Sequence, residues 1–402
     1  MRNQGVNQRS EPSTAVSRLN VLYLIDSLDL GGAQRQMSYL LAHIDRERVN
    51  PTLAVYYDRP HFGAEVEAAR VPVVLLSRYG GKDPRVPFRL ATLLRRGHFD
   101  LVHAMLRSPG QLARLAALMQ PRTHRTPVVV SERDLYLGRS RPRLWLERLL
   151  CRQGDAMIVN GERTRDHVEQ QVPGWHGRIH LVRNGIRMTQ PGADERRQAE
   201  RLRAKHARPG TRLLGIVARI DRDKGPDLVA AALRSLAPDV ASRLSVVWMG
   251  NQVDPDAVAP LHELARNPGA LASFTLAPPR RETRPFMISL DALLLASRAE
   301  SMPNVVLEGF AVGRPVIASD VGDVASVVVD GYSGWLIPAD DIDALARSIH
   351  AFVECEPQQL HNMGAKGQRR IAAEHGLEQL CQDTLAVYQK ATSRRRTSVS
   401  ST

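Results

Sequence analysis

The stretch DALLLASRAESMPNVVLEGFAVGRPVIASD, residues 291–320, decides the fold class of this chain. An apolar run of strand length comes first. A polar loop then leads to a helix that starts at Pro303, and a second apolar run closes the stretch. Two parallel strands joined by a helix are the expected result. The loop and the early turns of the helix hold two acids, Glu300 and Glu308. Because open α/β sheets bind ligands at the carboxyl ends of their strands, these acids indicate a ligand site.

Strand-like and helix-like segments alternate along most of the chain. In the first half the strand-like run 19–27 precedes a stretch, 33–44, whose apolar residues recur at helical spacing. A charged stretch at 191–210 interrupts the pattern, which resumes at 212–220. Strands that alternate with helices predict a parallel sheet covered on both faces. We therefore expect an α/β protein with two doubly wound, Rossmann-like domains that face a central cleft.

The domain boundaries follow from these segments and from the polar ends of the chain. The first 17 residues are polar and lack the apolar core of a signal peptide, and the last residues are rich in Ser, Thr and Arg. The expected parts are a disordered tail (1–17), an N-terminal domain (18–185), a C-terminal domain (186–376), a helix that packs back toward the N-terminal domain (377–391) and a second disordered tail (392–402).

The composition is that of a globular protein, with 43% hydrophobic and 24% charged residues in a chain of 402. No segment approaches the roughly 18 uncharged apolar residues of a membrane-spanning helix. The three cysteines are odd in number and widely spaced, which indicates neither a disulfide framework nor a metal site. Because cysteines without disulfides are typical of a reducing compartment, a cytoplasmic location is expected.

Positive charge is concentrated in the first half of the chain. Residues 1–190 hold 29 Lys and Arg against 17 Asp and Glu, a net +12, whereas the remainder holds 26 against 25, a net +1. A genomic bias toward arginine would spread over both halves. The asymmetry favours a basic face toward anionic lipid, a phosphorylated substrate or nucleic acid. An aromatic content of only 5% and the lack of a nucleic-acid motif argue against nucleic acid.

A cationic group follows the strand-like run that ends near Arg219. A polar turn leads to Lys224, Gly225 and Pro226, where a helix begins. A guanidinium, an ammonium and a helix N-terminus at the end of a strand suit a diphosphate. A turn with solvated surface charges is the alternative.

Two further groups also follow strands. The backbone N–H groups near Met302, Asn304 and Val305, at the start of the helix after Glu300, are available to an anion. Gly31-Gly32, between a strand and a helix, allows close approach of the backbone to a ligand, although a plain turn explains it as well. Acids early in a helix also favour the helix dipole, which is the structural alternative for Glu308.

The N-terminal half offers less specific candidates. His103 and Arg133 each follow a strand-like run and are candidates for the acceptor side of a cleft, with a structural role as the alternative for His103. The segment RPRLWLERLL carries a basic amphipathic patch that either packs in the core or contacts a membrane. Its apolar residues are Trp145, Leu146, Leu149 and Leu150.

Taken in order, these groups resemble family 4 of the GT-B glycosyltransferases, which are retaining nucleotide-sugar transferases. The resemblance covers about residues 19–391 and is strongest over 211–340. The matching motifs are Glu300 with Glu308, Arg219 with Lys224-Gly225, Gly31-Gly32, Asn184-Gly185 at the domain junction, and DGYSGWLIPADD at 330–341.

The resemblance implies roles for these residues, and it implies sugar transfer without a cofactor or an obligatory metal ion. The implied roles are diphosphate binding for Arg219 and Lys224, ribose binding for Glu308, donor-sugar binding for Glu300 with the amides of 302–305, loop closure for Gly32, and lining of the donor pocket for Gly250. The implied reaction moves a sugar from a nucleoside-diphosphate sugar to an acceptor hydroxyl. The anomeric configuration is retained by front-face displacement.

The acceptor is expected to be an anionic, lipid-linked or cell-surface polysaccharide intermediate at the inner membrane face. The chain departs from the family pattern at Arg133, often His, at Ala277 and Ser301, often Gly, and at Asp323 and Ser326, where Gly and Glu are usual. Two other classes remain open: a nucleotide-sugar epimerase or hydrolase on the same fold, and a non-catalytic binding protein with a basic face.

Overall fold

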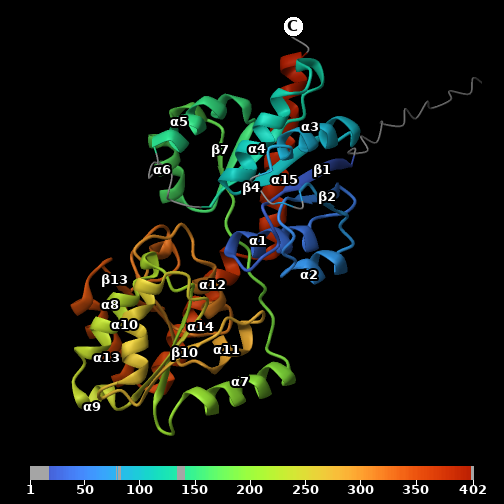
Figure 1. Ribbon diagram of the computed structural model, residues 1–402. Coiled ribbons are helices and arrows are strands. Elements are labelled where there is room, and N and C mark those ends of the chain that lie inside the picture. The colour runs from blue at the N-terminus through green and yellow to red at the C-terminus, as the bar shows by residue number, and fades with distance from the viewer. Residues whose placement is uncertain (1–17, 78, 80–82, 134–140, 400–402) are drawn as a thin grey trace, which may run out of the picture.

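The computed structural model describes residues 18–77, 79, 83–133 and 141–399, which form two α/β domains (Figure 1). The first tail predicted above, 1–17, lies outside the described residues. Each domain is built on one parallel sheet, so the fold class predicted from the alternation of strands and helices is confirmed.

The N-terminal domain holds a seven-stranded sheet in the order β3-β2-β1-β4-β5-β6-β7. Its strands are β1 (Leu19–Leu24), β2 (Val49–Val55), β3 (Val73–Leu75), β4 (Leu101–Met105), β5 (Val128–Glu132), β6 (Ala156–Val159) and β7 (Ile179–Leu181). Its helices are α1 (Gly32–His43), α2 (Gly63–Ala68), α3 (Val86–Arg96), α4 (Arg107–Leu118), α5 (Arg141–Leu150) and α6 (Glu162–Gln171).

The C-terminal domain holds a six-stranded sheet in the order β10-β9-β8-β11-β12-β13. Its strands are β8 (Arg212–Val217), β9 (Leu244–Met249), β10 (Ser273–Ala277), β11 (Ala292–Leu295), β12 (Val316–Ser319) and β13 (Gly334–Ile337). Its helices are α7 (Ala193–His206), α8 (Pro226–Arg234), α9 (Pro238–Ala241), α10 (Pro255–Arg266), α11 (Arg284–Ser289), α12 (Asn304–Ala311), α13 (Ile342–Glu354) and α14 (Pro357–Glu374).

The strand order reverses once in each sheet, between β1 and β4 and between β8 and β11. At such a point the connections leave toward opposite faces, which opens a crevice at the carboxyl ends of the strands. The stretch 291–320 supplies β11, the loop, α12 and β12, so its acids lie beside the crevice of the C-terminal sheet. Both sheets are packed with buried aliphatic side chains on their two faces.

The last helix, α15 (Leu377–Val399), returns to the N-terminal domain and packs beside α1 (Figure 1). Leu380, Leu385 and Tyr388 enter the same core as strand β1. The helix continues to Val399, so the tail expected at 392–402 is wrong for 392–399; residues 400–402 lie outside the described part. Among the described helices, none combines the length and the apolar character needed to cross a bilayer.

The chain passes between the domains at two adjacent places. Ile186 donates its N–H to the carbonyl of His375 at 2.8 Å, and the His375 ring contacts the carbonyl of Asn184 through Nδ1, also at 2.8 Å. These bonds hold the two crossings together at the base of the cleft.

Candidate active site

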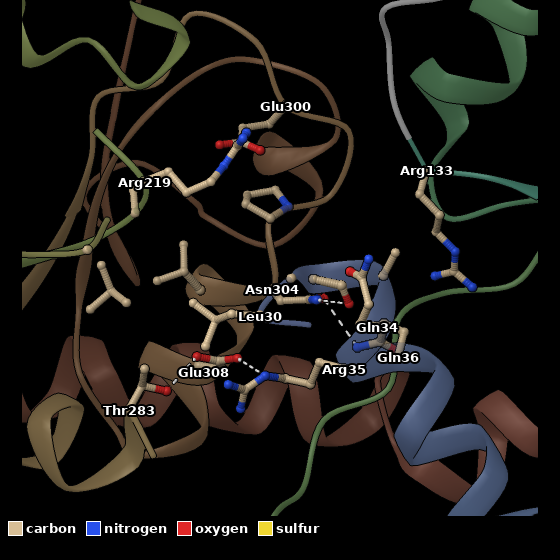
Figure 2. Close-up of a pocket in the computed structure, with 18 of the residues that line it drawn as sticks. Leu30, Gln34, Arg35, Gln36, Arg133, Arg219, Thr283, Glu300, Asn304 and Glu308 are labelled. Atoms are coloured by element: carbon tan, nitrogen blue, oxygen red, sulfur yellow. Dashed lines mark hydrogen bonds and ion pairs between the residues drawn. The ribbon is translucent and has the colours of Figure 1, made fainter. Parts of the chain in front are cut away.

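A cavity of about 580 Å³ lies between the two domains at the carboxyl ends of their strands (Figure 2). The loops after β8, β9 and β11 line one wall, and the loops after β1 and β5 line the other. All ten residues predicted for donor binding or catalysis line this cavity: Gly31, Gly32, Arg219, Lys224, Gly250, Glu300, Met302, Asn304, Val305 and Glu308. Residues that are far apart in sequence meet here because parallel strands end at one edge.

Lys224 and Glu300 form a close ion pair on the C-terminal wall. The Lys224 Nζ lies 2.5 Å from Glu300 Oε1, and the Ser297 hydroxyl donates to the same oxygen at 2.8 Å. Both charged side chains are largely shielded from solvent, at 17% and 13% exposure. Lys224 ends a turn in which Gly225 has φ +65°, and a Cβ on Gly225 would lie 2.3 Å from the Ala296 carbonyl. Glycine is therefore required to place Lys224 against β11.

Arg219 lies beside this pair but is more exposed. Its guanidinium reaches Asp221 at 3.2 Å, and 59% of the side chain is exposed to solvent. Gly250, at the end of β9, packs directly on the turn that carries Arg219, since a Cβ there would lie 1.8 Å from the Ala218 carbonyl. The glycine thus allows the ends of β8 and β9 to meet.

The first turn of α12 forms the floor of the cavity. Pro303 is the N-cap and has no side-chain hydrogen bond to the helix, so the N–H groups of Asn304 and Val305 have no capping partner there. Unpaired N–H groups and the positive end of the helix dipole suit a phosphate.

Glu308 is held by one residue from each domain. Its Oε1 lies 3.3 Å from the Arg35 Nε of α1, and its Oε2 accepts from the Thr283 hydroxyl at 3.2 Å (Figure 2). The negative charge of Glu308 raises the pKa of Arg35. Neither Arg35 nor Thr283 was predicted. The Arg35 contact depends on how the two domains pack, and the Thr283 contact on how α11 and α12 pack, which no local pattern encodes.

The Gly31-Gly32 loop touches α12 directly. Asn304 donates from Nδ2 to the Gly32 carbonyl at 2.8 Å, and a Cβ on Gly32 would lie 2.9 Å from that nitrogen. Gln36 and Asn184 donate to the Asn304 Oδ1 at 3.2 and 2.8 Å. Asn304 therefore joins α12 to the N-terminal domain.

Arg133 lines the opposite wall, across the view from Arg219 and Glu300 in Figure 2. It donates to the Asn184 Oδ1, and its buried Nε has no hydrogen-bond partner among the described residues. Burial lowers its pKa to about 10. A half-buried guanidinium without a neutralising carboxylate among the described residues is suited to an anionic ligand.

His103 does not line the cavity, which corrects the expectation that it faces the cleft. Its ring is 1% exposed and bonds to the Tyr388 hydroxyl and to the Ser131 hydroxyl, each at 2.7 Å. Helix α15 covers it. The sequence predicted that this helix packs toward the N-terminal domain, but not that it lies over His103. Burial, with a smaller effect from Arg133, lowers the pKa of His103 to about 3.

The residues that depart from the family pattern lie at different distances from the cavity. Ala277 ends β10 and accepts the Gly250 N–H at 3.1 Å, and Ser326 bonds to the Asp323 carbonyl at 2.7 Å away from the cavity lining. Ser301 lines the cavity beside Glu300 and bonds to the N-terminal domain. Within the described ranges, no group of three or more His, Cys, Asp or Glu side chains is arranged to hold a metal ion.

Comparison with known proteins gives two adjoining family matches. Residues 30–190 match the family described as "Glycosyltransferase Family 4", and residues 198–370 match "Glycosyl transferases group 1". The chain is 30% identical over 259 residues to alpha-maltose-1-phosphate synthase of Mycolicibacterium smegmatis, covering 61% of this chain and 66% of that one. It is 29% identical over 309 residues to D-inositol 3-phosphate glycosyltransferase of Jonesia denitrificans, covering 73% and 72%.

Solved structures share the fold at low sequence identity. The structure of Anabaena HepE in complex with UDP-glucose aligns with a TM-score of 0.78 at 20% identity, over 92% of this chain and all of that one. WaaG, described as a glycosyltransferase involved in lipopolysaccharide biosynthesis, aligns with a TM-score of 0.70 at 16% identity, over 92% and 99%. The two parallel-sheet domains are therefore those of the GT-B fold, and the chain belongs to the family 4 glycosyltransferases.

Proposed function

We propose that this glycosyltransferase moves a sugar from a nucleoside-diphosphate sugar to an acceptor hydroxyl with retention of the anomeric configuration. The observation that carries the proposal is the arrangement on one wall of the cavity. Lys224 and Glu300 lie in contact beside the N-terminus of α12, and Glu308 stands about one turn further along the same helix. A diphosphate on the helix N-terminus has a cation beside it. Glu300 and Glu308 are then placed for the groups attached at its two ends.

The rate acceleration would come from fixed charges. Breaking the glycosyl–phosphate bond leaves negative charge on the departing oxygen, and Lys224, Arg219 and the α12 amides are oriented toward that charge before the reaction. We therefore expect activity without added divalent cations. This expectation is checked by assaying transfer in EDTA.

Retention by front-face displacement is proposed because neither acid that lines the cavity is free to act as a nucleophile. Among the described residues, Glu300 and Glu308 are the acids that line the cavity. Glu300 is engaged by Lys224 and Ser297, and Glu308 by Arg35 and Thr283. A front-face displacement, in which the leaving phosphate helps to deprotonate the acceptor, requires no covalent sugar–enzyme intermediate.

A donor screen tests the proposal. Thermal stabilisation of the full chain is measured with UDP-, GDP- and ADP-sugars, starting with UDP-glucose because HepE was solved with it. The stabilising donor is then incubated with acceptors, and NMR determines the anomeric configuration of the product. An inverted product would contradict retention. Release of free sugar or of an epimer without any acceptor would favour the hydrolase or epimerase alternative.

The acceptor is proposed to be anionic and presented at a membrane surface. Support comes from Arg133 on the N-terminal wall and from the net +12 of residues 1–190. The names of the two relatives above refer to maltose 1-phosphate and inositol 3-phosphate, which are both phosphorylated. A lipid-linked saccharide diphosphate carries the same kind of charge.

Helix α5 supports the membrane part of this proposal. Trp145 and Leu149 lie one turn apart and are 66% and 57% exposed, beside the exposed Arg141 and Arg148. Leu150, by contrast, is buried, so the amphipathic patch divides between core and surface. Exposed apolar and cationic side chains on one helix suit an anionic bilayer surface.

Vesicle flotation tests the membrane contact. The full chain is expected to float with phosphatidylglycerol vesicles at low salt and to be released at high salt, and not to float with phosphatidylcholine. Replacing both Trp145 and Leu149 by Ala should abolish flotation. Phe88→Ala, at an equally exposed position on α3, is the matched control. No binding to anionic vesicles at low salt would contradict the membrane proposal while leaving the transfer proposal intact.

A further inference from the structure

The turn between β6 and α6 of the N-terminal domain reaches across the cleft to the loop that carries Glu300. Asn160, the first residue after β6, and Ser301, the neighbour of Glu300, both line the cavity. Asn160 is 2% exposed, Ser301 6%, and Thr164 on α6 is completely buried. Three polar side chains from two domains thus meet in a buried corner beside the donor-side acid.

The hydrogen bonds in this corner have a defined direction. The Ser301 hydroxyl donates to the Asn160 Oδ1 at 2.6 Å, because a carbonyl oxygen only accepts. Its single hydrogen is then used, so Thr164 donates its own hydroxyl hydrogen to the Ser301 oxygen, also at 2.6 Å. The Ser301 backbone is fixed as well, since its carbonyl accepts the Asp323 N–H at 2.7 Å.

This chain of bonds orients the amide of Asn160. With Oδ1 anchored on Ser301, the planar amide turns its NH₂ group away from Ser301. No described residue accepts a hydrogen bond from the Asn160 Nδ2, although the side chain lines the cavity. An oriented amide donor therefore faces ligand space next to Glu300.

We propose that Asn160 binds a hydroxyl of the transferring sugar through its Nδ2, and that Ser301 and Thr164 are positioning residues that aim it. The inference rests on the proposed function, because it takes the sugar of a nucleotide sugar as the ligand beside Glu300. A carboxylate accepts hydrogen bonds from sugar hydroxyls and an amide NH₂ donates to them. Glu300 and Asn160 together can therefore bind both the hydrogen and the oxygen of a hydroxyl. Asn160 thereby contributes to the choice of sugar from the domain opposite the nucleotide.

Such a donor discriminates because a ligand without the matching hydroxyl leaves the buried NH₂ unpaired. Ser301 stands where the family pattern often has glycine, and a glycine offers no hydroxyl to Asn160. The serine thus fixes an amide that would otherwise be free to rotate. The discrimination is expected to depend on Ser301 as much as on Asn160.

The test compares each nucleoside diphosphate with the matching nucleotide sugar, because only the sugar reaches Asn160. The pairs are UDP with UDP-glucose, UDP with UDP-N-acetylglucosamine, GDP with GDP-mannose and ADP with ADP-glucose. Calorimetry is carried out on the pair that stabilises the wild-type chain most. Asn160→Ala is expected to weaken nucleotide-sugar binding about tenfold, as for one lost hydrogen bond, and to leave diphosphate binding within about twofold.

Five further variants, including one control, separate positioning from folding. Ser301→Gly and Thr164→Val should weaken nucleotide-sugar binding in the same selective way, whereas Thr164→Ser keeps the hydroxyl and should bind the nucleotide sugar as the wild type does. Because Ser301 acts through Asn160, adding Ser301→Gly to Asn160→Ala should cost nothing further. Gln170→Ala, exposed on α6, is the control.

The outcomes distinguish failure of the role of Asn160 from failure of the proposed function. Equal weakening of diphosphate and nucleotide-sugar binding in Asn160→Ala, or fully additive losses in the double variant, would overturn the role of Asn160. If Asn160→Ala does not fold, unchanged binding in Ser301→Gly would overturn it as well. A wild-type chain that none of the pairs stabilises would overturn the proposed function, and this inference with it.

Discussion

Lys224 and Glu300 show what a single ion pair does in this site. They come from different strand ends, 76 positions apart in the chain, and both are shielded from solvent. The Coulomb interaction between such shielded charges is stronger than for an exposed pair, and it fixes the ammonium beside the helix N-terminus of α12. The ammonium is therefore held in place before any leaving charge develops.

Removal of this cation should slow the transfer step. Lys224→Ala is expected to lower kcat at least a hundredfold, because a preorganised group that stabilises developing charge contributes about 3 kcal/mol to the transition state. Steady-state kinetics with saturating donor measure the effect. Arg234→Ala, on the exposed side of α8, should leave kcat unchanged. Activity of Lys224→Ala within tenfold of wild type would contradict the assignment.

His103 makes the stability of the N-terminal domain depend on pH. Its pKa is about 3 in the folded chain, below the usual 6.5, because it is buried. Unfolding lets the ring take up a proton below pH 6.5, so stability is complete above that pH and declines as the pH falls toward 3. Between pH 6.5 and 5 the loss from this one group amounts to about 2 kcal/mol.

Hydrogen exchange of the β4 and α15 amides measures this loss. His103→Gln cannot be protonated and should show a free energy of opening that falls by about 2 kcal/mol less than in the wild type over this pH range. The other histidines contribute equally in both chains. An identical pH dependence in the two chains would show that His103 does not carry the effect.

At the scale of single elements, the connection after each strand decided which site residues could be predicted. Arg219, Glu300 and Gly32 follow strands β8, β11 and β1, and a parallel sheet brings such positions together whatever the packing of the helices. Asn160 also follows a strand but was not singled out. Its importance depends on a contact with Ser301 in the other domain, and short-range sequence patterns contain no signal for such a contact.

The start of helix α6 shows how an element of one domain depends on the other. Its N-cap, Gly161, has no side chain to offer, and the Asp323 Oδ1 of the C-terminal domain accepts the Arg163 N–H at 3.1 Å in its place. A Cβ on Gly161 would lie 1.8 Å from the other Asp323 oxygen. The glycine in one domain therefore makes room for the capping acid in the other.

Gly161→Ala should push Asp323 off the helix. We expect a lower melting temperature, because overpacking at a buried contact costs about 1–3 kcal/mol, together with weaker nucleotide-sugar binding as the Thr164–Ser301 contact separates. Adding Asp323→Gly removes the obstructing side chain and should recover much of the loss in melting temperature. Differential scanning calorimetry of the two variants checks this. A double variant less stable than Gly161→Ala would contradict the steric explanation.

At the scale of the whole molecule, the two sheets and the cleft between them were predictable, and the individual contacts across the cleft were not. The alternation of strands and helices is a local signal, and it was sufficient for the fold class. Contacts such as Arg35 with Glu308 join positions 273 residues apart. Helix α15 packs in the N-terminal core, as expected, but the pairing of its Tyr388 with His103 was not predicted. Such pairings depend on the three-dimensional closure of the chain.

Gln36 adds uncharged hydrogen bonds where the chain crosses between the domains. Its amide donates to the Gly185 carbonyl at 2.8 Å and to Asn304 at 3.2 Å, and it accepts the Gly185 N–H at 2.9 Å. The side chain is 2% exposed, so water cannot replace these bonds. Gln36→Leu keeps the approximate size but leaves two buried backbone groups at the crossing unpaired, which costs about 1–3 kcal/mol for each.

We expect each domain to remain folded in Gln36→Leu, and the two domains to unfold at different temperatures. Differential scanning calorimetry should show a wild-type transition shared by both domains, and two resolved transitions in the variant, because the variant loses three of the hydrogen bonds that couple the domains at the crossing. Far-UV circular dichroism at 20 °C should match in the two chains. Gln379→Leu, on the exposed surface of α15, controls for the loss of an amide. A single, merely lower transition in Gln36→Leu would mean that Gln36 stabilises the fold without coupling the domains.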